Sequence, residues 1–289
     1  MQRKLHPLEG IVAVFALFFV LALAIGFAQA DEGRAEPAVL LRSSSALVQD
    51  AKSGETVFAK NSGAVLPIAS ITKLMTALVL LDAKVDLAQR VAVSGEDQDM
   101  LKGTRSRLRP GSVLTRDELL LLALMSSENR AAAALGRTHP GGTQAFVAAM
   151  NAKAVALGMG DSRFVDPTGL SPDNVSSARD LAKLVRAAHD YPLIRDYSTR
   201  ERATVRVYGR PQAFRNTNGL VRSSRWEIGL SKTGYISEAG RCLVMRVHLA
   251  SKDLIVVLLD SWGRHSRVGD ANRIRRWLET NHRPRELAS

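Results

Sequence analysis

The chain has 289 residues, of which 46% are hydrophobic, and its formal net charge at pH 7 is +12. This apolar content suits a globular protein with a sizeable core and excludes a disordered or fibrous chain. The excess positive charge favours an anionic polymer or a membrane surface as a partner, or simply aids solubility. It does not indicate nucleic acid, because no arginine run or aromatic–basic interleaving accompanies it.

The N-terminal segment has the three parts of a secretory signal peptide. Arg3 and Lys4 precede an apolar run over residues 11–26, and Ala-Gln-Ala follows at 28–30. The run is shorter than the roughly 20 residues of a membrane-spanning helix, which favours cleavage after residue 30 over a permanent anchor. Both alternatives place the rest of the chain outside the cytoplasm. The predicted organisation is a signal peptide over 1–30, a polar leader over 31–38 and one folded domain over 39–289.

The first elements of this domain are two strands and a helix. Residues 46–50 and 55–61 have strand-like composition, and Ala-Lys-Ser-Gly between them is typical of a hairpin turn. From Ile71 the apolar residues recur at helical spacing, which predicts a helix with one face in the core.

Three more helices are predicted in the middle of the chain. Thr115 and Glu118 form a capping box before the almost wholly apolar stretch 119–124, so we expect that helix to be buried. A third helix is predicted over 143–158. A fourth begins at a capping pattern over 177–180 and ends before Pro192.

The C-terminal part returns to strands. The strands are predicted at 229–234, 241–249 and 254–260, and a last helix at 268–280. Cys242 is the one cysteine, which excludes an intramolecular disulfide, and its apolar neighbours favour a buried small side chain over a reactive thiol. Strands at both ends and helices between them predict an α+β fold. In this fold one antiparallel sheet is flanked by terminal helices and carries an inserted helical lobe.

Three short motifs carry candidate chemistry: Ser70-Ile-Thr-Lys73, Ser127-Glu-Asn129 and Lys232-Thr-Gly234. Each is weak alone, since Lys-Ser-Gly at 52–54 also fits the third pattern but lies in a predicted turn. Their joint occurrence in this order is what indicates a site.

Ser70 and Lys73 have the spacing of a nucleophile and its base. One helical turn separates them, so their side chains lie on one face and within reach of each other. A serine hydroxyl needs a neighbouring base, and lysine serves only where burial or a second cation favours its neutral amine. Lys232 is a candidate for that second cation. The backbone N–H of Ser70, at the start of the helix, is suited to binding an oxyanion.

Other chemistries are less well supported by the residues. The six histidines lack metal-ligand spacing, and no Gly-x-Ser-x-Gly motif indicates an α/β-hydrolase. Arg264 and Arg267 could meet a substrate carboxylate, but their position before a helix favours a solvated surface.

The motifs and their surroundings resemble the penicillin-binding proteins and serine β-lactamases. The likeness is greatest to the low-molecular-mass D,D-peptidases, and among these to the D-alanyl-D-alanine endopeptidases of the penicillin-binding protein seven type. It spans roughly residues 41–280 and is carried by the stretches 68–77, 125–133, 166–171, 216–220 and 229–235. It implies that 39–289 is a serine D,D-peptidase domain of the β-lactamase/transpeptidase-like fold. It also implies a periplasmic location, peptidoglycan as substrate, β-lactams as covalent inhibitors and no cofactor or metal, and it identifies no protein partner.

The resemblance implies four catalytic residues. Ser70 attacks the carbonyl of D-alanine, with Lys73 as its general base. Ser127 passes a proton toward the leaving amine, and Asn129 holds Lys73 and the substrate amide. Glu128 stands where other members carry aspartate, as it does in the endopeptidase group.

It implies four substrate-binding residues as well. Lys232 and Thr233 hold the carboxylate beside the scissile bond, and Gly234 completes their motif. The N–H groups of Tyr235 and Ser70 form the oxyanion hole.

Four functions fit this site to different degrees. Endopeptidase action on D-alanyl-meso-diaminopimelate crosslinks is favoured by the resemblance, and also because the chain ends soon after its last predicted helix, without the extra domain of anchored carboxypeptidases. D-alanyl-D-alanine carboxypeptidase activity is the main alternative. A β-lactamase is disfavoured because class A enzymes use a glutamate after the second motif, and none occurs between Glu128 and Glu201. An inert wall-binding scaffold is disfavoured because every catalytic position is filled.

Overall fold

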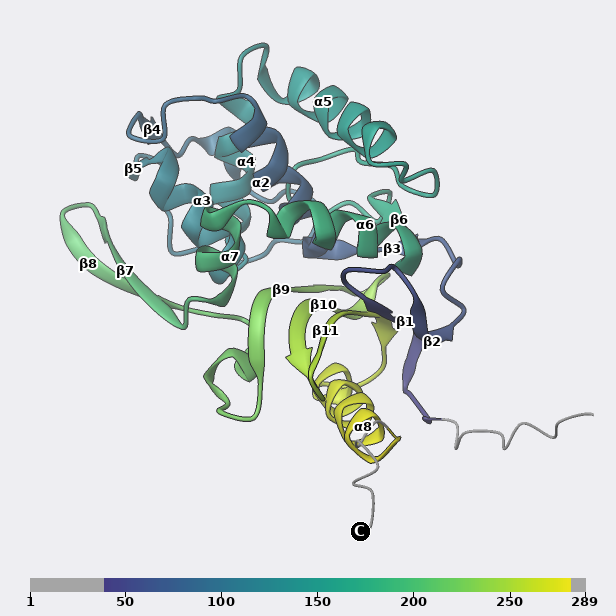
Figure 1. Cartoon of the computed structure of the whole chain (residues 1–289). Helices are drawn as coiled ribbons and strands as arrows, with labels where there is room; N and C mark the ends of the chain where they lie inside the picture. The colour runs from purple at the N-terminus through teal and green to yellow at the C-terminus, as the bar shows by residue number, and fades with distance from the viewer. Residues whose placement is uncertain (1–38, 282–289) are drawn as a thin grey trace, which may run out of the picture. The chain divides into compact units, whose positions relative to one another are not determined.

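Strands from both ends of the chain form one five-stranded antiparallel sheet (Figure 1). The computed structural model describes residues 39–281, so the predicted signal peptide and polar leader lie outside the described residues. The strand order is β2-β1-β11-β10-β9. The strands are β1 (Ser43–Asp50), β2 (Thr56–Lys60), β9 (Glu227–Ile236), β10 (Gly240–Leu249) and β11 (Lys252–Ser261).

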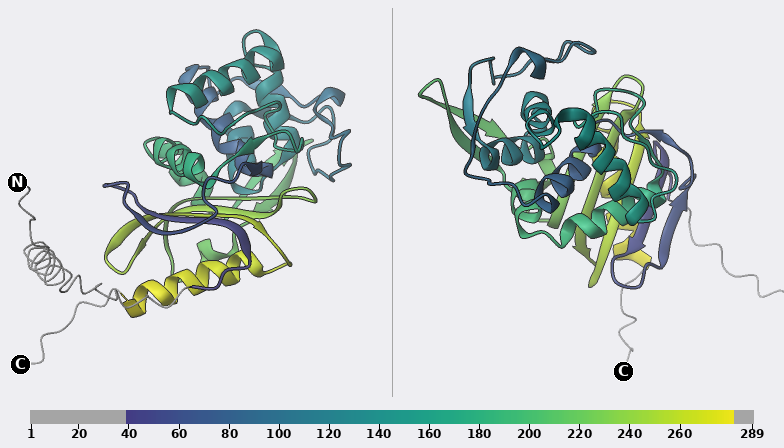
Figure 2. Two further views of the ribbon diagram at one scale, coloured as in Figure 1. Left: turned by 90° about the vertical axis from the view of Figure 1, so that its right-hand side faces the viewer. Right: turned by 90° about the horizontal axis from the view of Figure 1, so that it is seen from above.

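Successive side chains along a strand point to opposite faces of the sheet, and here both sets are apolar. Each face therefore needs a cover of helices. Along β10, Val244 belongs to the core on one face, while Leu243 and Met245 belong to the core on the other. Helix α6 (Ala178–His189) packs on the first face, and α8 (Ser266–Asn281) packs on the second (Figure 2).

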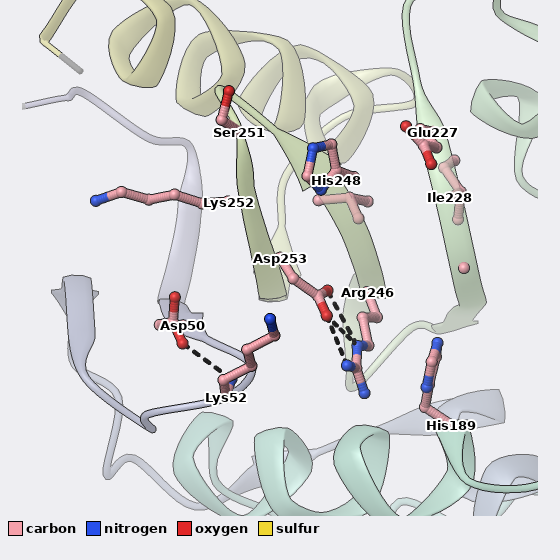
Figure 3. Close-up of a pocket in the computed structure, with 12 residues that line it drawn as sticks. Asp50, Lys52, His189, Glu227, Ile228, Arg246, His248, Ser251, Lys252 and Asp253 are labelled. Carbon is pink, nitrogen blue, oxygen red and sulfur yellow. Dashed lines mark hydrogen bonds and ion pairs between the residues drawn. The ribbon is translucent and has the colours of Figure 1, made fainter. Parts of the chain in front are cut away.

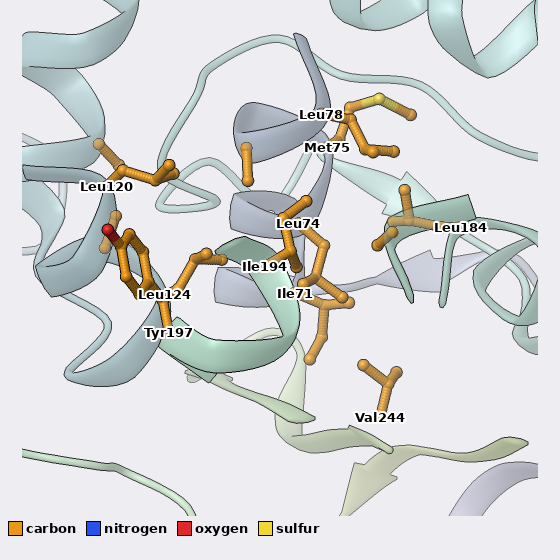
Figure 4. Close-up of a cluster of buried hydrophobic side chains, with 14 of the residues drawn as sticks. Ile71, Leu74, Met75, Leu78, Leu120, Leu124, Leu184, Ile194, Tyr197 and Val244 are labelled. Atoms are coloured by element: carbon orange, nitrogen blue, oxygen red, sulfur yellow. The ribbon is translucent and has the colours of Figure 1, made fainter. Parts of the chain in front are cut away.

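The remaining helices lie on the α6 side and surround α2. Their bounds are η1 (Ala69–Thr72), α2 (Lys73–Asp82), α3 (Arg116–Met125), α4 (Asn129–Arg137), α5 (Gly142–Ala156) and α7 (Pro192–Thr199). The predicted stripe of α2, including Leu74 and Leu78, is fully buried and lies close to Leu120 of α3 and Ile194 of α7 (Figure 4). Apolar packing thus fixes the start of α2, where Ser70 and Lys73 lie.

Short elements complete the domain. They are η2 (Gly95–Asp97), η3 (Gly219–Arg222) and three strand pairs, β3 (Leu66–Pro67) with β6 (Val175–Ser176), β4 (Arg90–Ala92) with β5 (Val113–Thr115), and β7 (Arg202–Val207) with β8 (Arg210–Arg215). None of the helices within 39–281 combines the length and the apolar character needed to cross a bilayer.

The sequence predicted the main sheet, α2, α3, α5, α6 and α8 to within a few residues, and the α+β architecture is confirmed. The capping box of Thr115 and Glu118 is present. Cys242 is buried as expected, and burial raises the pKa of its thiol to about 11. The sheet was expected to be flanked by terminal helices. Within residues 39–281 the C-terminal helix α8 takes this place.

The prediction missed α4, α7 and the β7–β8 hairpin. Pro192 was interpreted as the end of one helix, whereas it is also the first residue of the next, a position that proline tolerates because no N–H is needed there. The hairpin turns at Tyr208 and Gly209, both with positive φ, and a tyrosine in this conformation gives no turn signal in the sequence.

Asp270 joins α8 to the first strand of the sheet. It is fully buried, and its carboxylate accepts hydrogen bonds from the backbone N–H groups of Arg42 and Ser43 and from the Ser43 hydroxyl, at 2.7–3.1 Å. Arg273 Nη1 pairs with it at 2.5 Å.

We predict that Asp270→Ala lowers the free energy of unfolding by about 3 kcal/mol, because it leaves buried donors without an acceptor. Urea denaturation measures this. Glu279→Ala, on the same helix but 47% exposed, is the control and should change stability by less than about 1 kcal/mol. Equal effects of the two substitutions would contradict the anchoring role of Asp270.

Candidate active site

The turn that carries Ser70 is tightly constrained. Ala69 has a φ of 47°, in the left-handed region that non-glycine residues rarely occupy, and Ser70 follows within η1. Gly169 packs against this turn, where a Cβ would lie 2.0 Å from the carbonyl oxygen of Ala69. The position of the Ser70 hydroxyl is therefore set by close backbone packing.

Lys73 lies next to Ser70 and is fully buried. Its Nζ is 2.9 Å from Ser70 Oγ, 2.8 Å from Asn129 Oδ1 and 2.6 Å from the carbonyl oxygen of Thr168. The last two oxygens can only accept hydrogen bonds. A neutral amine therefore gives its two hydrogens to them and directs its lone pair at the Ser70 hydroxyl.

Burial lowers the pKa of Lys73 to about 7, against the opposing influence of Asp166, Glu128 and Asp99. Burial is thus the main cause of the shift, and the expected second cation is not required for it. The base is available in neutral form near physiological pH.

Asp166 organises the loop that supplies the Thr168 carbonyl. Its carboxylate accepts hydrogen bonds from the backbone N–H groups of Thr168, Gly169 and Ser171 and from Asn174 Nδ2. The stretch 166–171 contributed to the family resemblance, but no role was predicted for it. Every residue has a backbone carbonyl, so the sequence does not indicate which one will accept a hydrogen bond from Lys73.

Ser127 and Asn129 lie at the corner between α3 and α4. Ser127 has a φ of 59°, a strained value, between the end of α3 at Met125 and the start of α4 at Asn129. Asn129 begins α4, and its Nδ2 donates to Thr104 Oγ1 at 2.9 Å, which fixes its Oδ1 toward Lys73.

The third motif lies on β9, beside the other two. Lys232 is almost fully buried, and its Nζ donates to Ser127 Oγ at 2.8 Å. Burial lowers the pKa of Lys232 well below its ordinary value, and the charges of Lys73 and Arg267 lower it further. The Thr233 hydroxyl lies 2.6 Å from that of Thr217, a residue to which the sequence assigned no role.

Gly234 allows β9 to approach the nucleophile. A Cβ at this position would lie 2.8 Å from the carbonyl oxygen of Ile68 and 3.2 Å from the backbone nitrogen of Ser70. Tyr235 follows with a side chain that is 56% exposed and stacked beneath the Arg241 guanidinium.

The expectation for Arg267 was wrong. Arg264 is exposed as predicted, but Arg267 is partly buried and donates to the carbonyl oxygens of Gly234 and Cys242 at 3.0 and 3.3 Å. It supports β9 from behind, because the first turn of α8 lies against this part of the sheet.

A second cleft, of about 540 Å³, lies at the other end of β9 (Figure 3). Arg246 and Asp253 form an ion pair in it, with His189 nearby on α6. It contains none of the predicted site residues.

The three motifs therefore converge on one site. It holds a serine hydroxyl, a buried amine whose lone pair can point at that hydroxyl, and a second lysine hydrogen-bonded to a second serine. This set of groups suits acyl transfer through a serine ester.

Comparison with known proteins agrees with this chemistry. The Peptidase_S11 family, described as D-alanyl-D-alanine carboxypeptidase, matches residues 32–263. A Pseudomonas aeruginosa protein named D-alanyl-D-alanine endopeptidase is 50% identical over 243 residues, which are 83% of this chain and 78% of that one. An Escherichia coli protein of the same name is 44% identical over 277 residues, covering 93% and 88% of the two chains. The solved structure of a Streptomyces DD-transpeptidase has a TM-score of 0.77 at 25% identity, over 85% of this chain and 99% of that one. The expected transpeptidase-like fold is confirmed.

The pKa of Lys73 makes acylation of Ser70 dependent on pH. Only the neutral amine accepts the serine proton, so the second-order rate constant for acylation by penicillin should rise about tenfold from pH 6 to pH 8. Stopped-flow measurement across this range, with circular dichroism to confirm an unchanged fold, checks the prediction. A flat profile would show that Lys73 is not the base.

Proposed function

The chain belongs to the Peptidase_S11 family of serine D-alanyl-D-alanine peptidases, and from this we propose that it hydrolyses D-alanyl-meso-diaminopimelate crosslinks of peptidoglycan through an acyl-enzyme at Ser70. The family acts on peptidoglycan, and hence outside the cytoplasm. The observation that carries the proposal is the buried amine of Lys73, held 2.9 Å from the Ser70 hydroxyl by two fixed acceptors.

In the first step, Ser70 Oγ attacks the carbonyl carbon of D-alanine while Lys73 takes its proton. The N–H groups of Ser70 and Tyr235 bind the oxyanion that forms, and the close passage of β9 at Gly234 supports this pairing. Collapse of the intermediate breaks the C–N bond and leaves an ester on Ser70.

The leaving amine takes a proton from the Ser127 hydroxyl, and Lys232, whose Nζ donates to that hydroxyl at 2.8 Å, replaces that proton. The proton that Lys73 removed from Ser70 then returns to Lys232, which leaves Lys73 neutral for the next step. Lys232 and Thr233 hold the carboxylate next to the scissile bond, and its negative charge raises the pKa of Lys232 again by direct attraction. Water then hydrolyses the ester, with Lys73 as the base for this step as well.

The choice of endopeptidase over carboxypeptidase rests on the relatives. The two matched at 50% and 44% identity are both named endopeptidase, whereas the family as a whole is described as carboxypeptidase. The catalytic residues suit both reactions, since each substrate has a carboxylate beside the leaving nitrogen.

We further propose that residues 1–30 are a cleaved signal peptide, that residues 39–289 form the peptidase domain and that the enzyme acts in the periplasm. The basic, apolar and Ala-Gln-Ala parts of the signal support this.

Two alternatives have less support. A β-lactamase needs a positioned base for rapid deacylation, but the Asp166 carboxylate is engaged by the N–H groups of its own loop. An inert wall-binding scaffold would have no need of a buried lysine or of strain at Ser127.

We predict that penicillin forms a covalent adduct with Ser70 and that the adduct decays slowly, over many minutes. A β-lactam offers a strained acyl group and a carboxylate to this site, and the Asp166 carboxylate is held by the N–H groups of its own loop. Mass spectrometry of peptides maps the adduct, and Ser70→Ala should abolish it with the fold intact. An adduct on another serine would refute the nucleophile, and rapid recovery of free enzyme would favour the β-lactamase.

We predict a higher kcat/KM for a crosslinked muropeptide dimer than for removal of the terminal D-alanine from a monomeric pentapeptide. One enzyme preparation is given both substrates, and the products are separated by liquid chromatography. Faster trimming of the pentapeptide would identify a carboxypeptidase.

A further inference from the structure

A groove of about 570 Å³ leads away from the catalytic loop toward the β7–β8 hairpin. Ser127, Asn129 and Thr217 line its inner end, and Arg105, Arg107 and Arg215 line it farther out. The remaining lining residues are Ser126, Glu128, Gln212, Ala213 and Phe214.

The inner end of the groove is on the side of the leaving group. Ser127 is the group that delivers a proton to the leaving amine, and Thr217 is hydrogen-bonded to Thr233, which holds the adjacent carboxylate. A free D-alanine ends at that carboxylate. A longer leaving peptide continues beyond it and enters the groove.

The outer groove carries unneutralised positive charge. Arg107 is fixed, since its guanidinium lies 4.9 Å from the Phe214 ring centre and donates to the Ala213 carbonyl. Arg105 and Arg215 are exposed, and neither takes part in any ion pair found within residues 39–281.

The opposing charge in the groove is weaker. Glu128 is the one carboxylate in its lining, and it accepts a hydrogen bond from the Arg130 N–H as the cap of α4. Three arginines against one engaged carboxylate leave the groove cationic.

The hairpin concentrates this charge further. Arg215 of β8 lies directly opposite Arg202 of β7, so both side chains extend from the same face. Like charges in this arrangement repel, and a bound anion relieves the repulsion.

We propose that this groove binds the acidic peptide that leaves when a crosslink is cut, with Arg105 and Arg215 pairing to carboxylates beyond the one at the scissile bond. The proposal rests on the proposed endopeptidase function and makes the groove its specificity determinant. A leaving D-alanine does not reach Arg105 or Arg215, whereas a leaving stem peptide forms an ion pair with each of them.

The test combines enzyme and substrate changes. The variant Arg105→Gln/Arg215→Gln removes both exposed cations, and Arg225→Gln/Arg276→Gln removes two exposed arginines that do not line the groove. Each enzyme is given the muropeptide dimer and the same dimer with the remote carboxylates of its leaving stem amidated. Acylation by penicillin, which has no leaving peptide to reach Arg105 and Arg215, reports on the catalytic residues.

We expect kcat/KM for the dimer to fall about tenfold in the groove variant, the size of two solvent-exposed ion pairs, and less than twofold in the control. Amidation of the dimer should lower kcat/KM of the wild type by a similar factor. It should lower kcat/KM of the groove variant less than twofold, because that variant has already lost the arginines with which the carboxylates pair. The penicillin acylation rate should change less than twofold in both variants.

Equal losses in the groove and control variants, or an undiminished effect of amidation in the groove variant, would overturn the proposal. A parallel fall in penicillin acylation would assign the loss to the catalytic residues instead. If the wild type trims the pentapeptide faster than it splits the dimer, the proposed endopeptidase function is wrong. If it splits the dimer faster but the groove variant behaves like the control, the function stands and the groove proposal is wrong.

Discussion

The burial of one amine is the constraint on which the rest of this structure depends. Lys73 reaches Ser70 from within the core, and a charged ammonium there would lose the solvation that water gives it. This penalty lowers the pKa of Lys73, and the neutral amine it favours is the form that the proposed mechanism needs as a base. The apolar packing of α2 maintains the burial, while Asn129 and the Thr168 carbonyl orient the lone pair.

The surrounding backbone is strained where this geometry demands it. Ala69 and Ser127 both have positive φ, a conformation that costs about 1–3 kcal/mol at each non-glycine residue. Gly169 and Gly234 allow backbone approaches that any Cβ would prevent. The cores on both faces of the sheet supply the stability that holds these positions.

The sequence revealed those parts of the fold and site that side-chain type encodes. Helical periodicity located α2, a capping box located α3, and three spaced motifs identified the residues that meet around Ser70. It did not reveal the Thr168 carbonyl or the backbone contacts of Arg267, because a main-chain acceptor has no residue code and depends on tertiary packing. The β7–β8 hairpin was missed for a local reason, since Tyr208 takes a conformation usually left to glycine or asparagine.

The two buried lysines have opposite needs, and substrate charge reconciles them. Lys73 must be neutral to accept a proton, whereas Lys232 must be charged to hold a carboxylate. In the empty site burial opposes the charged form of both, and the charge of Lys73 further lowers the pKa of Lys232. A carboxylate that binds beside Thr233 stabilises an ammonium on Lys232 by direct contact, and that ammonium in turn favours the neutral form of Lys73. Binding of a substrate with this carboxylate thus favours the charged form of Lys232 and the neutral form of Lys73 together. A ligand without that carboxylate leaves the pKa of Lys232 lowered by burial, which disfavours the charged form that donates to Ser127.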